Sequence, residues 1–215
     1  MKYGIVGASG RMGREIALVF GAEGHELVLT ADVAGTECRG RPEVILDFSS
    51  PAALVGTLAL RSEHGCALVV GTTALRGDQL DALRTIPAAV VQSFNFATGV
   101  NILKMVLRDY APMLSGWDAE FVEAHHNKKK DAPSGTAILL RDAAGRGGAP
   151  IHSLRLGGVP GDHEVLFAGE GEVLTFGHRA ISRSVFAWGA HLAAKFAVRA
   201  PNGFYSFEDV LRNKT

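Results

Sequence analysis

The residue types best suited to catalysis lie within one short stretch, residues 123–137, whose sequence is EAHHNKKKDAPSGTA. It contains two adjacent histidines, a lysine three residues later, and a Ser-Gly-Thr turn ahead of an apolar run. A histidine accepts or donates a proton near pH 7, so it suits general acid–base catalysis. A lysine and the free N–H groups at a helix start both bind anions. The combination predicts a site for a small substrate that carries more than one carboxylate.

Each part of this stretch also has a purely structural interpretation. His125 ends a strand-like run and is therefore expected at a strand tip, but one histidine of the pair can equally form hydrogen bonds within the protein. Three consecutive lysines, residues 128–130, are typical of a solvated surface, although a carboxylate-bearing substrate needs one cation. Ser134 can act as an ordinary helix N-cap. A metal site is not expected, because the histidines have neither a nearby cysteine nor the H-E-x-x-H pattern.

A glycine-rich turn near the amino terminus predicts a second site. The segment GASGRMG, residues 7–13, follows the first expected strand and opens the first helix. Glycines there permit a tight turn and a close approach of the backbone to a pyrophosphate, while the helix start offers N–H groups and a positive dipole end. The spacing is G-x-x-G-x-x-G rather than the commoner G-x-G-x-x-G, so a turn without a ligand stays an alternative.

Asp32 strengthens the interpretation of this turn as a dinucleotide site. It ends the second expected strand, about 20 residues beyond the glycines, where an acidic residue hydrogen-bonds the adenosine ribose. A carboxylate there repels a 2′-phosphate, and Val33 supplies no compensating cation. The pair therefore favours NADH over NADPH. Three arginines could weaken that preference, namely Arg11, Arg39 and Arg41.

The elements that must position these residues alternate between strand and helix in the first half of the chain. Five short apolar or β-branched runs are flanked by turn residues, as buried parallel strands are: residues 3–7, 26–31, 44–48, 67–70 and 88–91. Helical spacing lies between them. The repeated order predicts a Rossmann-type, doubly wound parallel sheet, with Gly71-Thr72-Thr73 on its ligand-binding edge. That segment either contacts the nicotinamide half of a dinucleotide or simply ends a strand.

The second half of the chain changes character near Thr98-Gly99. The expected elements there are helices over residues 100–114, 136–144 and 184–198 and strands over residues 120–124, 153–156, 163–167 and 172–177. Glycines separate the last three strands, so the pattern predicts an α+β domain with a mixed or antiparallel sheet. We therefore expect a dinucleotide-binding domain over residues 1–98 and a substrate domain over residues 99–199.

The composition argues against several other classes of function. Charged residues make up 20% of the 215 residues, and 22 Lys+Arg balance 22 Asp+Glu, so neither nucleic acid nor an anionic membrane is an expected partner. The chain opens without an apolar signal segment, and its longest uncharged stretch is interrupted by polar residues and a proline. Cys38 and Cys66 are too few for a disulfide scaffold. We expect a reduced, cytoplasmic enzyme without a membrane-spanning helix.

Five motifs together resemble the dihydrodipicolinate reductases of bacterial lysine and diaminopimelate synthesis: GASGRMG, LDFSSP, GTT, NFATGVN and EAHHNKKKDAPSGTA. The resemblance extends over almost the whole chain, and the E-x-H-H-x-x-K-x-D-x-P-S-G-T pattern is highly specific. It implies a Rossmann domain completed by residues 200–215 and a substrate domain that forms a homotetramer through its sheet. Two features depart from longer members. The connections after Asp32 and Leu139 are short, and Val33 stands where an arginine often follows the acidic residue.

The resemblance also implies roles for individual residues. His125 would be the acid–base residue, and Lys129 a second proton-handling cation. The carboxylates of the substrate would be held by His126, Ser134, Gly135 and Thr136. The residues assigned to the nicotinamide cofactor are Gly7, Ala8, Ser9, Gly10, Arg11, Met12, Asp32, Gly71, Thr72, Thr73, Ser93, Phe94, Asn95 and Phe96.

These assignments predict reduction of 4-hydroxy-tetrahydrodipicolinate to tetrahydrodipicolinate, with loss of water, by NADH or NADPH and without a metal. Two other functions stay open. One is a two-domain dehydrogenase for another amino or imino dicarboxylate, for which the His-His-Lys-Ser-Gly-Thr spacing has no evident reason. The other is a non-catalytic regulator that senses a dinucleotide, which would need neither His125 nor Lys129. Turnover of a reduced cofactor with a defined dicarboxylate separates the three.

Overall fold

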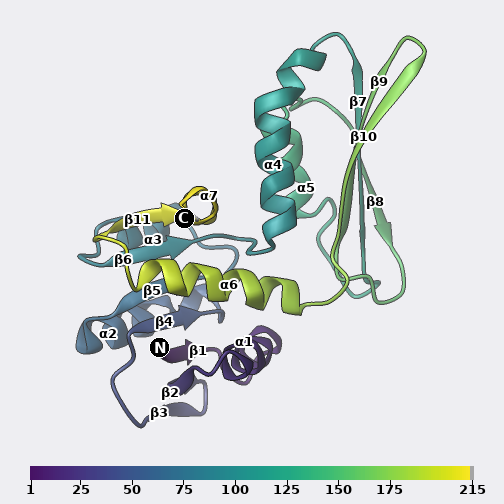
Figure 1. Ribbon diagram of the computed structural model, residues 1–215. Helices are drawn as coiled ribbons and strands as arrows, with labels where there is room; N and C mark the ends of the chain where they lie inside the picture. Colours follow the sequence, from purple (N-terminus) through teal and green to yellow (C-terminus); the bar gives the residue numbers. More distant parts are fainter. Residues whose placement is uncertain (214–215) are drawn as a thin grey trace. The chain divides into compact units, whose positions relative to one another are not determined.

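The computed structural model describes residues 1–213, which form two compact units (Figure 1). The first unit comprises Met1–Phe96 together with the chain from Ser184 onward, and the second comprises Ala97–Arg183. The second unit is therefore an insertion within the first. Within residues 1–213 we find no helix that is both long and apolar enough to cross a bilayer.

A seven-stranded sheet forms the centre of the first unit. Its strand order is β11-β6-β5-β4-β1-β2-β3, and neighbouring strands are parallel except for β2 and β3. The strands are β1 (Lys2–Val6), β2 (Glu26–Asp32), β3 (Gly35–Cys38), β4 (Val44–Asp47), β5 (Ala67–Val70), β6 (Ala89–Gln92) and β11 (Gly203–Ser206). Strand β4 is buried at every position, so both faces of the sheet must be covered.

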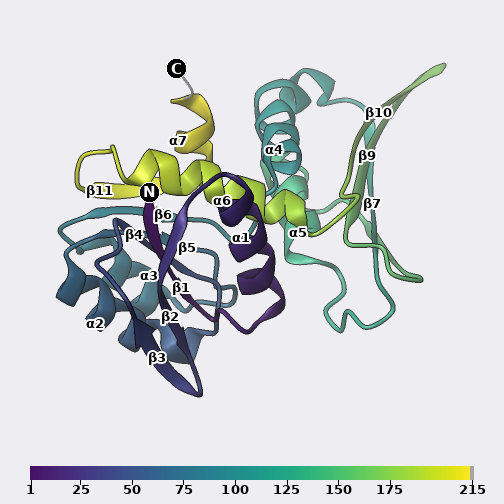
Figure 2. The same ribbon diagram turned by 60° about the horizontal axis from the view of Figure 1, so that its bottom comes forward.

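Helices cover both faces of this sheet. Buried residues of α1 (Arg11–Ala22) and α6 (Ser184–Ala197) share one core cluster with alternate strand positions, and the two helices lie side by side (Figure 2). Buried residues of α2 (Leu54–His64) and α3 (Gly77–Arg84) share a second cluster with the remaining strand positions. Helix α7 (Phe207–Arg212) closes the chain, and a 3-10 turn over Pro51–Ala53 precedes α2. The predicted doubly wound, Rossmann-type sheet is confirmed.

The chain returns to the first unit earlier than the sequence predicted. We expected residues 200–215 alone to complete the dinucleotide-binding domain and residues 99–199 to form the second domain. Helix α6 instead belongs to the first unit. Its alanines pack into the core beside α1, and four of them are fully buried: Ala187, Ala190, Ala193 and Ala194. The sequence predicts this helix, but an alanine-rich face carries no local signal for the sheet against which it packs.

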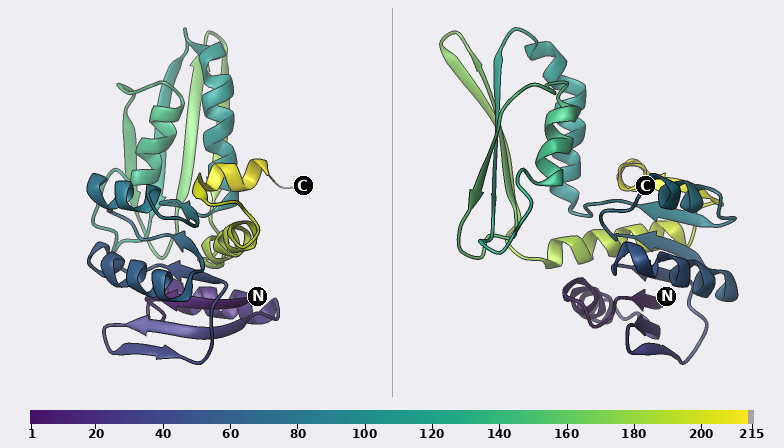
Figure 3. Two further views of the ribbon diagram at one scale, coloured as in Figure 1. Left: turned by 90° about the vertical axis from the view of Figure 1, so that its left-hand side faces the viewer. Right: turned by 180° about the vertical axis from the view of Figure 1, so that it is seen from behind.

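The second unit is a four-stranded mixed sheet with two helices on one face (Figure 3). The strand order is β10-β9-β7-β8, and β7 pairs antiparallel with β9 and parallel with β8. The elements are α4 (Thr98–Tyr110), β7 (Asp118–His125), α5 (Gly135–Ala143), β8 (Ile151–Arg155), β9 (Asp162–Gly169) and β10 (Glu172–Arg179). This α+β architecture agrees with the predicted fold class.

Three local features differ from the sequence prediction. Strands β3 and β11 were not expected, because one is exposed throughout and the other is only partly buried, so neither has the apolar run of a buried strand. The helix expected over residues 100–114 ends at Tyr110 and continues as a 3-10 turn over Ala111–Leu114. The change coincides with Pro112, which has no N–H to donate and whose ring crowds the preceding helical turn.

Candidate active site

Strand β7 brings two ionisable side chains into the interior of the second unit. Phe121, Glu123 and His125 are buried, and the residues between them are at least partly exposed. Successive side chains of a strand project from opposite faces, so a glutamate and a histidine two residues apart share one face. Burial of two such groups is costly unless each has a partner.

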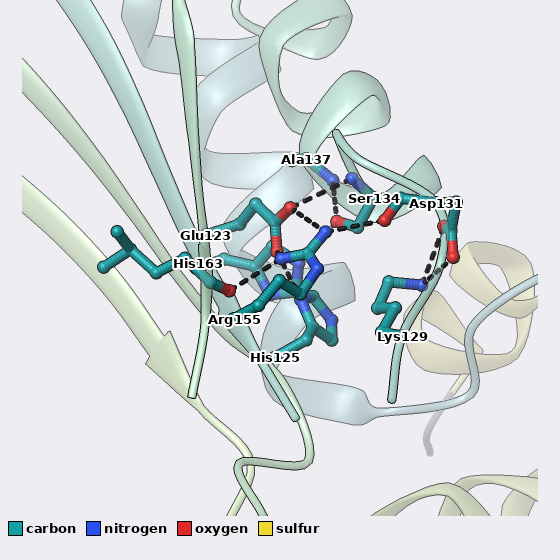
Figure 4. Close-up of polar contacts among 9 residues, drawn as sticks. Glu123, His125, Lys129, Asp131, Ser134, Ala137, Arg155 and His163 are labelled. Atoms are coloured by element: carbon teal, nitrogen blue, oxygen red, sulfur yellow. Dashed lines mark hydrogen bonds and ion pairs between the residues drawn. The ribbon is translucent and has the colours of Figure 1, made fainter. Parts of the chain in front are cut away.

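Glu123 is the centre of a buried polar network (Figure 4). Its side chain is 0% exposed, and Arg155 donates to both carboxylate oxygens, at 2.8 Å to Oε1 and 2.9 Å to Oε2. Oε2 also contacts Nδ1 of His125, and Oε1 accepts from the main-chain N–H of Ser134 at 3.2 Å. The parallel register pairs Arg155 with His125, which sets the guanidinium beside the carboxylate. Both oxygens of Glu123 are therefore held by several donors.

The turn that precedes α5 is built around Ser134. Its hydroxyl accepts from the N–H of Ala137 at 3.1 Å, which caps the helix, and lies 3.2 Å from Nε2 of His163. Ser134 is buried, so both its hydroxyl and its N–H act within the protein. Gly135 and Thr136 occupy the first two helical positions, at the positive end of the helix dipole. This helix start is the part of the turn that can receive an anion.

The three lysines differ in exposure. Lys128 and Lys130 are exposed, as expected of solvated charges. The side chain of Lys129 is 22% exposed, and its Nζ donates to both oxygens of Asp131, at 2.7 and 2.8 Å. His126 is half-buried, and its Nδ1 has no hydrogen-bond partner among residues 1–213. Lys129 lies close enough to His125 for its charge to lower the pKa of that imidazole (Figure 4), and His126 adjoins His125 in the chain.

Burial and charge set the ionisation of these groups. Burial raises the pKa of Glu123, but hydrogen bonds from Arg155, Ser153 and His125 outweigh this effect and bring the pKa down to about 2. Burial lowers the pKa of His125, the charge of Lys129 acts in the same direction, and Glu123 opposes both. Burial likewise lowers the pKa of His163 to about 4. Glu123 is therefore a carboxylate at neutral pH, and the imidazole of His163 is neutral.

The glycine-rich turn lines a pocket of about 540 Å³ in the first unit. Its lining includes residues from the turn, from the ends of β1 and β2, and from the segment after β4: Gly7, Ser9, Gly10, Asp32, Phe48 and Ser49. Helix α1 begins at Arg11, so its first N–H groups lie at this turn. A Cβ on Gly13 would lie 2.2 Å from the main-chain oxygen of Gly7, so only glycine permits this approach of helix and turn. The residues present fit the pyrophosphate of a dinucleotide.

Asp32 lies in the same pocket and is held by Ser9. Its Oδ2 accepts from the main-chain N–H of Ser9 at 2.9 Å, and its Oδ1 accepts from the hydroxyl of Ser9 at 3.0 Å. Val33 is fully exposed, and Arg39 pairs with Glu37 at 3.3 Å. A fixed carboxylate at the end of β2 matches the position at which dinucleotide sites bind the ribose hydroxyls.

The other residues predicted within the glycine-rich segment have different surroundings. Arg11 is exposed at the first position of α1. Ala8 and Met12 are partly buried and pack against the core of the first unit. The arginine is thus accessible to a ligand, whereas Ala8 and Met12 also support the fold.

Asp47, at the end of β4, organises the loops at the carboxyl edge of the sheet. It is 0% exposed and accepts from the hydroxyls of Thr57 and Thr72, both at 2.7 Å, and from the N–H of Ser49 at 3.1 Å. The side chain of Thr72 is therefore engaged inside the protein. Its neighbours differ, since Gly71 lies against the ring of Phe48 and Thr73 is exposed.

Residues 93–96 form a turn that leaves the first unit. The hydroxyl of Ser93 donates to the main-chain oxygen of Asn95 at 2.7 Å, and Phe94 is exposed. Phe96 is 2% exposed, and its ring packs between those of Phe48 and Phe207. The side chain of Phe96 is thus a core residue, in contrast to the role in cofactor binding that the sequence prediction gave to the whole segment.

The sequence prediction did not assign four residues of the polar network: Glu123, Asp131, Arg155 and His163. Glu123 carried a usable signal, because it precedes His125 by two residues in a strand and so shares its face. Arg155 and His163 lie on strands β8 and β9, and only the register of the sheet brings them to β7. No local pattern in the sequence shows that register.

Comparison with known proteins decides the family. Residues 1–96 match the family model described as dihydrodipicolinate reductase, N-terminus, and residues 99–211 match the one described as dihydrodipicolinate reductase, C-terminus. The chain belongs to the dihydrodipicolinate reductase family. The resemblance inferred from the motifs is confirmed.

Curated members of this family can be aligned with the chain over nearly their whole length. A 4-hydroxy-tetrahydrodipicolinate reductase from Thermosipho africanus is 49% identical over 214 residues, which cover 99% of this chain and 98% of that protein. One from Stenotrophomonas maltophilia is 41% identical over 231 residues, which cover 97% of this chain and 96% of that protein. Both units of the chain are therefore part of the shared architecture.

Solved structures show that the fold is shared more widely than the family. The structure of a dipicolinate-bound dihydrodipicolinate reductase from Paenisporosarcina sp. TG-14 matches with a TM-score of 0.77 at 23% identity, covering 96% of this chain and 97% of that chain. An aspartate dehydrogenase from Thermotoga maritima matches with a TM-score of 0.52 at 11% identity, covering 91% and 95%. These likenesses show the fold alone, so membership of the family rests on the sequence matches.

Proposed function

We propose that this member of the dihydrodipicolinate reductase family reduces 4-hydroxy-tetrahydrodipicolinate to tetrahydrodipicolinate, with loss of water, in the diaminopimelate route to lysine. The observation that carries the proposal is the buried Glu123–His125 pair, which lies in one unit with Lys129 and the start of α5. An acid–base group is thereby combined with two anion-binding groups. Full-length similarity to relatives named for this reaction supports the same substrate.

The charges of the second unit suit a substrate with two carboxylates. Nζ of Lys129 donates two hydrogen bonds to Asp131, which hold it in place, and an ammonium group carries a third N–H that can serve a substrate carboxylate. The start of α5 at Gly135 and Thr136 presents the positive end of a helix dipole, which favours a bound anion. His126 adds a half-buried imidazole. Lys129 and the helix start would each hold one carboxylate, assisted by His126.

The overall change adds a hydride and a proton to the substrate and releases one water molecule. A bound nicotinamide dinucleotide supplies the hydride. His125 exchanges the proton, and the charge of Lys129 assists by stabilising negative charge on the substrate. Positioning and electrostatic complementarity supply most of the reduction in the barrier, since the site needs no covalent nucleophile.

The first unit holds the dinucleotide in this proposal. The residues of the glycine-rich turn and the start of α1 would bind the pyrophosphate, and Asp32 would bind the adenosine ribose. Ser9 fixes the carboxylate of Asp32 through two hydrogen bonds, which orients it before the ligand arrives. Gly71, Thr73 and the main chain of residues 93–95 are proposed to complete the nicotinamide end.

The proposal is tested by following the absorbance of NADH or NADPH, with the substrate formed in the same cuvette from pyruvate and aspartate semialdehyde. Oxidation that depends on both substrate and protein is the expected result. Binding of the dinucleotide without any oxidation would instead indicate a sensing regulator. Oxidation only with a different amino or imino dicarboxylate would indicate another dehydrogenase.

We further propose that NADH is the preferred cofactor. The carboxylate of Asp32 lies in the pocket, and Val33 provides no positive charge to bind a 2′-phosphate. The kcat/KM for NADH should exceed that for NADPH, and Val33→Arg should narrow the ratio by about tenfold, which corresponds to ~1.4 kcal/mol. Arg76→Ala, an exposed change elsewhere in the first unit, serves as the control. A higher kcat/KM with NADPH in the unsubstituted protein would contradict this preference.

Two properties of the assembled protein complete the proposal. Family resemblance supports a homotetramer formed through the sheet of the second unit, which light scattering coupled to size-exclusion chromatography can test. A mass other than four chains would contradict it. Cys38 and Cys66 are both free thiols, which supports a reducing, cytoplasmic location.

A further inference from the structure

The interior of the second unit contains a buried ion pair, Glu123–Arg155, beside His125. A histidine that acts alone as an acid–base group does not require such a pair. Glu123 and Arg155 form a bidentate ion pair whose side chains are only 0% and 19% exposed. An ion pair of this kind is a poor source of stability, because the cost of removing both charges from water offsets much of their attraction. Its presence beside His125 therefore calls for a functional explanation.

The first part of the explanation concerns the imidazole. An ionised carboxylate only accepts hydrogen bonds, so the contact of Glu123 Oε2 with Nδ1 of His125 requires a hydrogen on Nδ1. Nε2 is then the nitrogen that takes up and releases a proton. That nitrogen lies beside Gly161, where a Cβ would come within 3.0 Å of it. The glycine leaves room next to the reactive edge of the ring.

The second part concerns the anion-binding turn. Oε1 of Glu123 accepts from the N–H of Ser134, the residue that caps α5. Nη2 of Arg155 donates to the main-chain oxygen of Asp131 at 2.6 Å, and Asp131 in turn holds Lys129. One ion pair therefore touches the segments that carry the acid–base residue, the lysine and the helix start.

We propose that Glu123 and Arg155 are positioning residues for the reduction: Glu123 fixes His125 with its hydrogen on Nδ1 and its Nε2 toward the substrate, and Arg155 keeps Glu123 ionised and immobile. This inference rests on the proposed function for its catalytic consequence, but the geometry that it assigns to His125 does not. The same carboxylate contacts both the imidazole and the N–H of Ser134 at the start of α5.

The direct test is nitrogen NMR of the protein with labelled histidines, with His125 assigned by its loss in His125→Ala. In the unsubstituted protein His125 should be the Nδ1–H tautomer above its pKa. Glu123→Gln places an amide donor opposite Nδ1, so the ring should convert to the Nε2–H tautomer. The pKa of His125 should also fall by roughly one unit or more, because an opposite charge raises the pKa of an imidazole by about 1–3 units.

The strand provides a matched control for this change. Glu120, also on β7, contacts Nε2 of His152 at 2.6 Å in an exposed pair. Glu120→Gln should leave both the tautomer and the pKa of His125 unchanged. Glu123→Asp keeps the carboxylate and should retain the Nδ1–H tautomer. An Nε2–H tautomer in the unsubstituted protein, or an unchanged His125 in Glu123→Gln, would overturn the inference; the first of these outcomes does not depend on whether Glu123→Gln folds.

Kinetics then link the geometry to the reaction. Glu123→Gln should lower kcat by about 10²-fold or more, as expected for loss of the correct histidine tautomer, with a much smaller change in KM. Its pH profile should shift to lower pH with the pKa of His125, and Glu123→Asp should recover part of kcat. Unchanged kcat with a converted tautomer would overturn the catalytic part of the inference. If the unsubstituted protein does not oxidise NADH with this substrate while the tautomer converts as expected, the proposed function fails and the assignment to His125 stands.

Discussion

Strand β7 contributes the glutamates of two glutamate–histidine pairs, one exposed across to β8 and one buried within the strand. Glu120 contacts His152 at 2.6 Å, with side chains 49% and 57% exposed. Glu123 contacts His125, with side chains 0% and 10% exposed. The buried pair has an arginine and a main-chain N–H as further partners, whereas water can screen the exposed pair.

The comparison teaches that the surroundings, and not the two residue types, determine whether such a pair holds its histidine in one orientation. An exposed ion pair contributes about 0–1 kcal/mol to stability and leaves both side chains mobile. A buried carboxylate must be compensated by fixed donors, and those donors immobilise the histidine that it contacts. Four predictions test this difference, in decreasing order of expected effect.

The largest contrast is expected in turnover. His125→Ala should lower kcat by ~10²–10⁴-fold, the range typical of a lost general acid–base group, while His152→Ala should change it by less than about twofold. Initial rates of NADH oxidation measure both. Similar rates for the two variants, with both proteins folded by circular dichroism, would remove His125 from the chemistry.

A second contrast is expected in stability, between two bidentate arginine–carboxylate pairs. Arg155→Met leaves Glu123 buried without its counter-charge, which should cost ~3–5 kcal/mol of unfolding free energy. Arg76 binds Asp78 through two hydrogen bonds at 3.0 and 3.1 Å, but both side chains are 67% exposed, so Arg76→Met should cost about 0–1 kcal/mol. Urea denaturation measures the difference. Equal losses would show that burial does not distinguish the pairs.

The third contrast concerns the pH dependence of stability. Hydrogen bonds lower the pKa of Glu123 from 4.5 to about 2, so its contribution is present above the unfolded pKa and is lost as the pH falls toward 2. Between pH 6 and pH 3 the unsubstituted protein should lose ~2 kcal/mol more unfolding free energy than Glu123→Gln. Glu120→Gln should follow the unsubstituted protein. Parallel stability curves for all three proteins would contradict the lowered pKa.

The smallest contrast extends the comparison to neighbouring lysines. Lys129→Ala should raise KM and lower kcat by about tenfold each, since a hydrogen bond between charged groups is worth ~1.5–3 kcal/mol. Lys130 is exposed, and Lys130→Ala should leave both constants unchanged. Steady-state kinetics over a range of substrate concentrations separate the two constants. An unchanged KM in Lys129→Ala would make Lys129 a surface charge like its neighbours.

The sequence predicts those features that depend on local pattern. The strand expected over residues 120–124, the glycine-rich turn and the helix start after Ser134 all have local signals, and the structure has a strand, a turn and a helix start there. Lys128 and Lys130 are exposed and Lys129 is partly buried, and the binding role of Lys129 stays a prediction. The fold class followed from the order of strands and helices, which is again a local signal repeated along the chain.

The features that the sequence did not show depend on contacts between distant segments. Arg155 and His163 reach Glu123 or Ser134 only through the pairing of β7 with β8 and β9. The placement of α6 in the first unit likewise follows from alanines that fit beside α1. Thr72 and Phe96 lie in segments expected to face the cofactor, yet their side chains turn inward to Asp47 and to the aromatic core.

The insertion of the second unit into the first has a consequence for folding during synthesis. When residues 1–96 have left the ribosome, β6 still lacks its neighbour β11, and one face of the sheet lacks the alanines of α6. The segments that complete this unit are separated by the whole of Ala97–Arg183, so its closing contacts are of long sequence range and form late. A nascent chain of this length presents an unpaired strand edge and an uncovered apolar surface, the features by which incomplete domains aggregate. The inserted unit, in contrast, is continuous in sequence and can fold as soon as its last strand emerges.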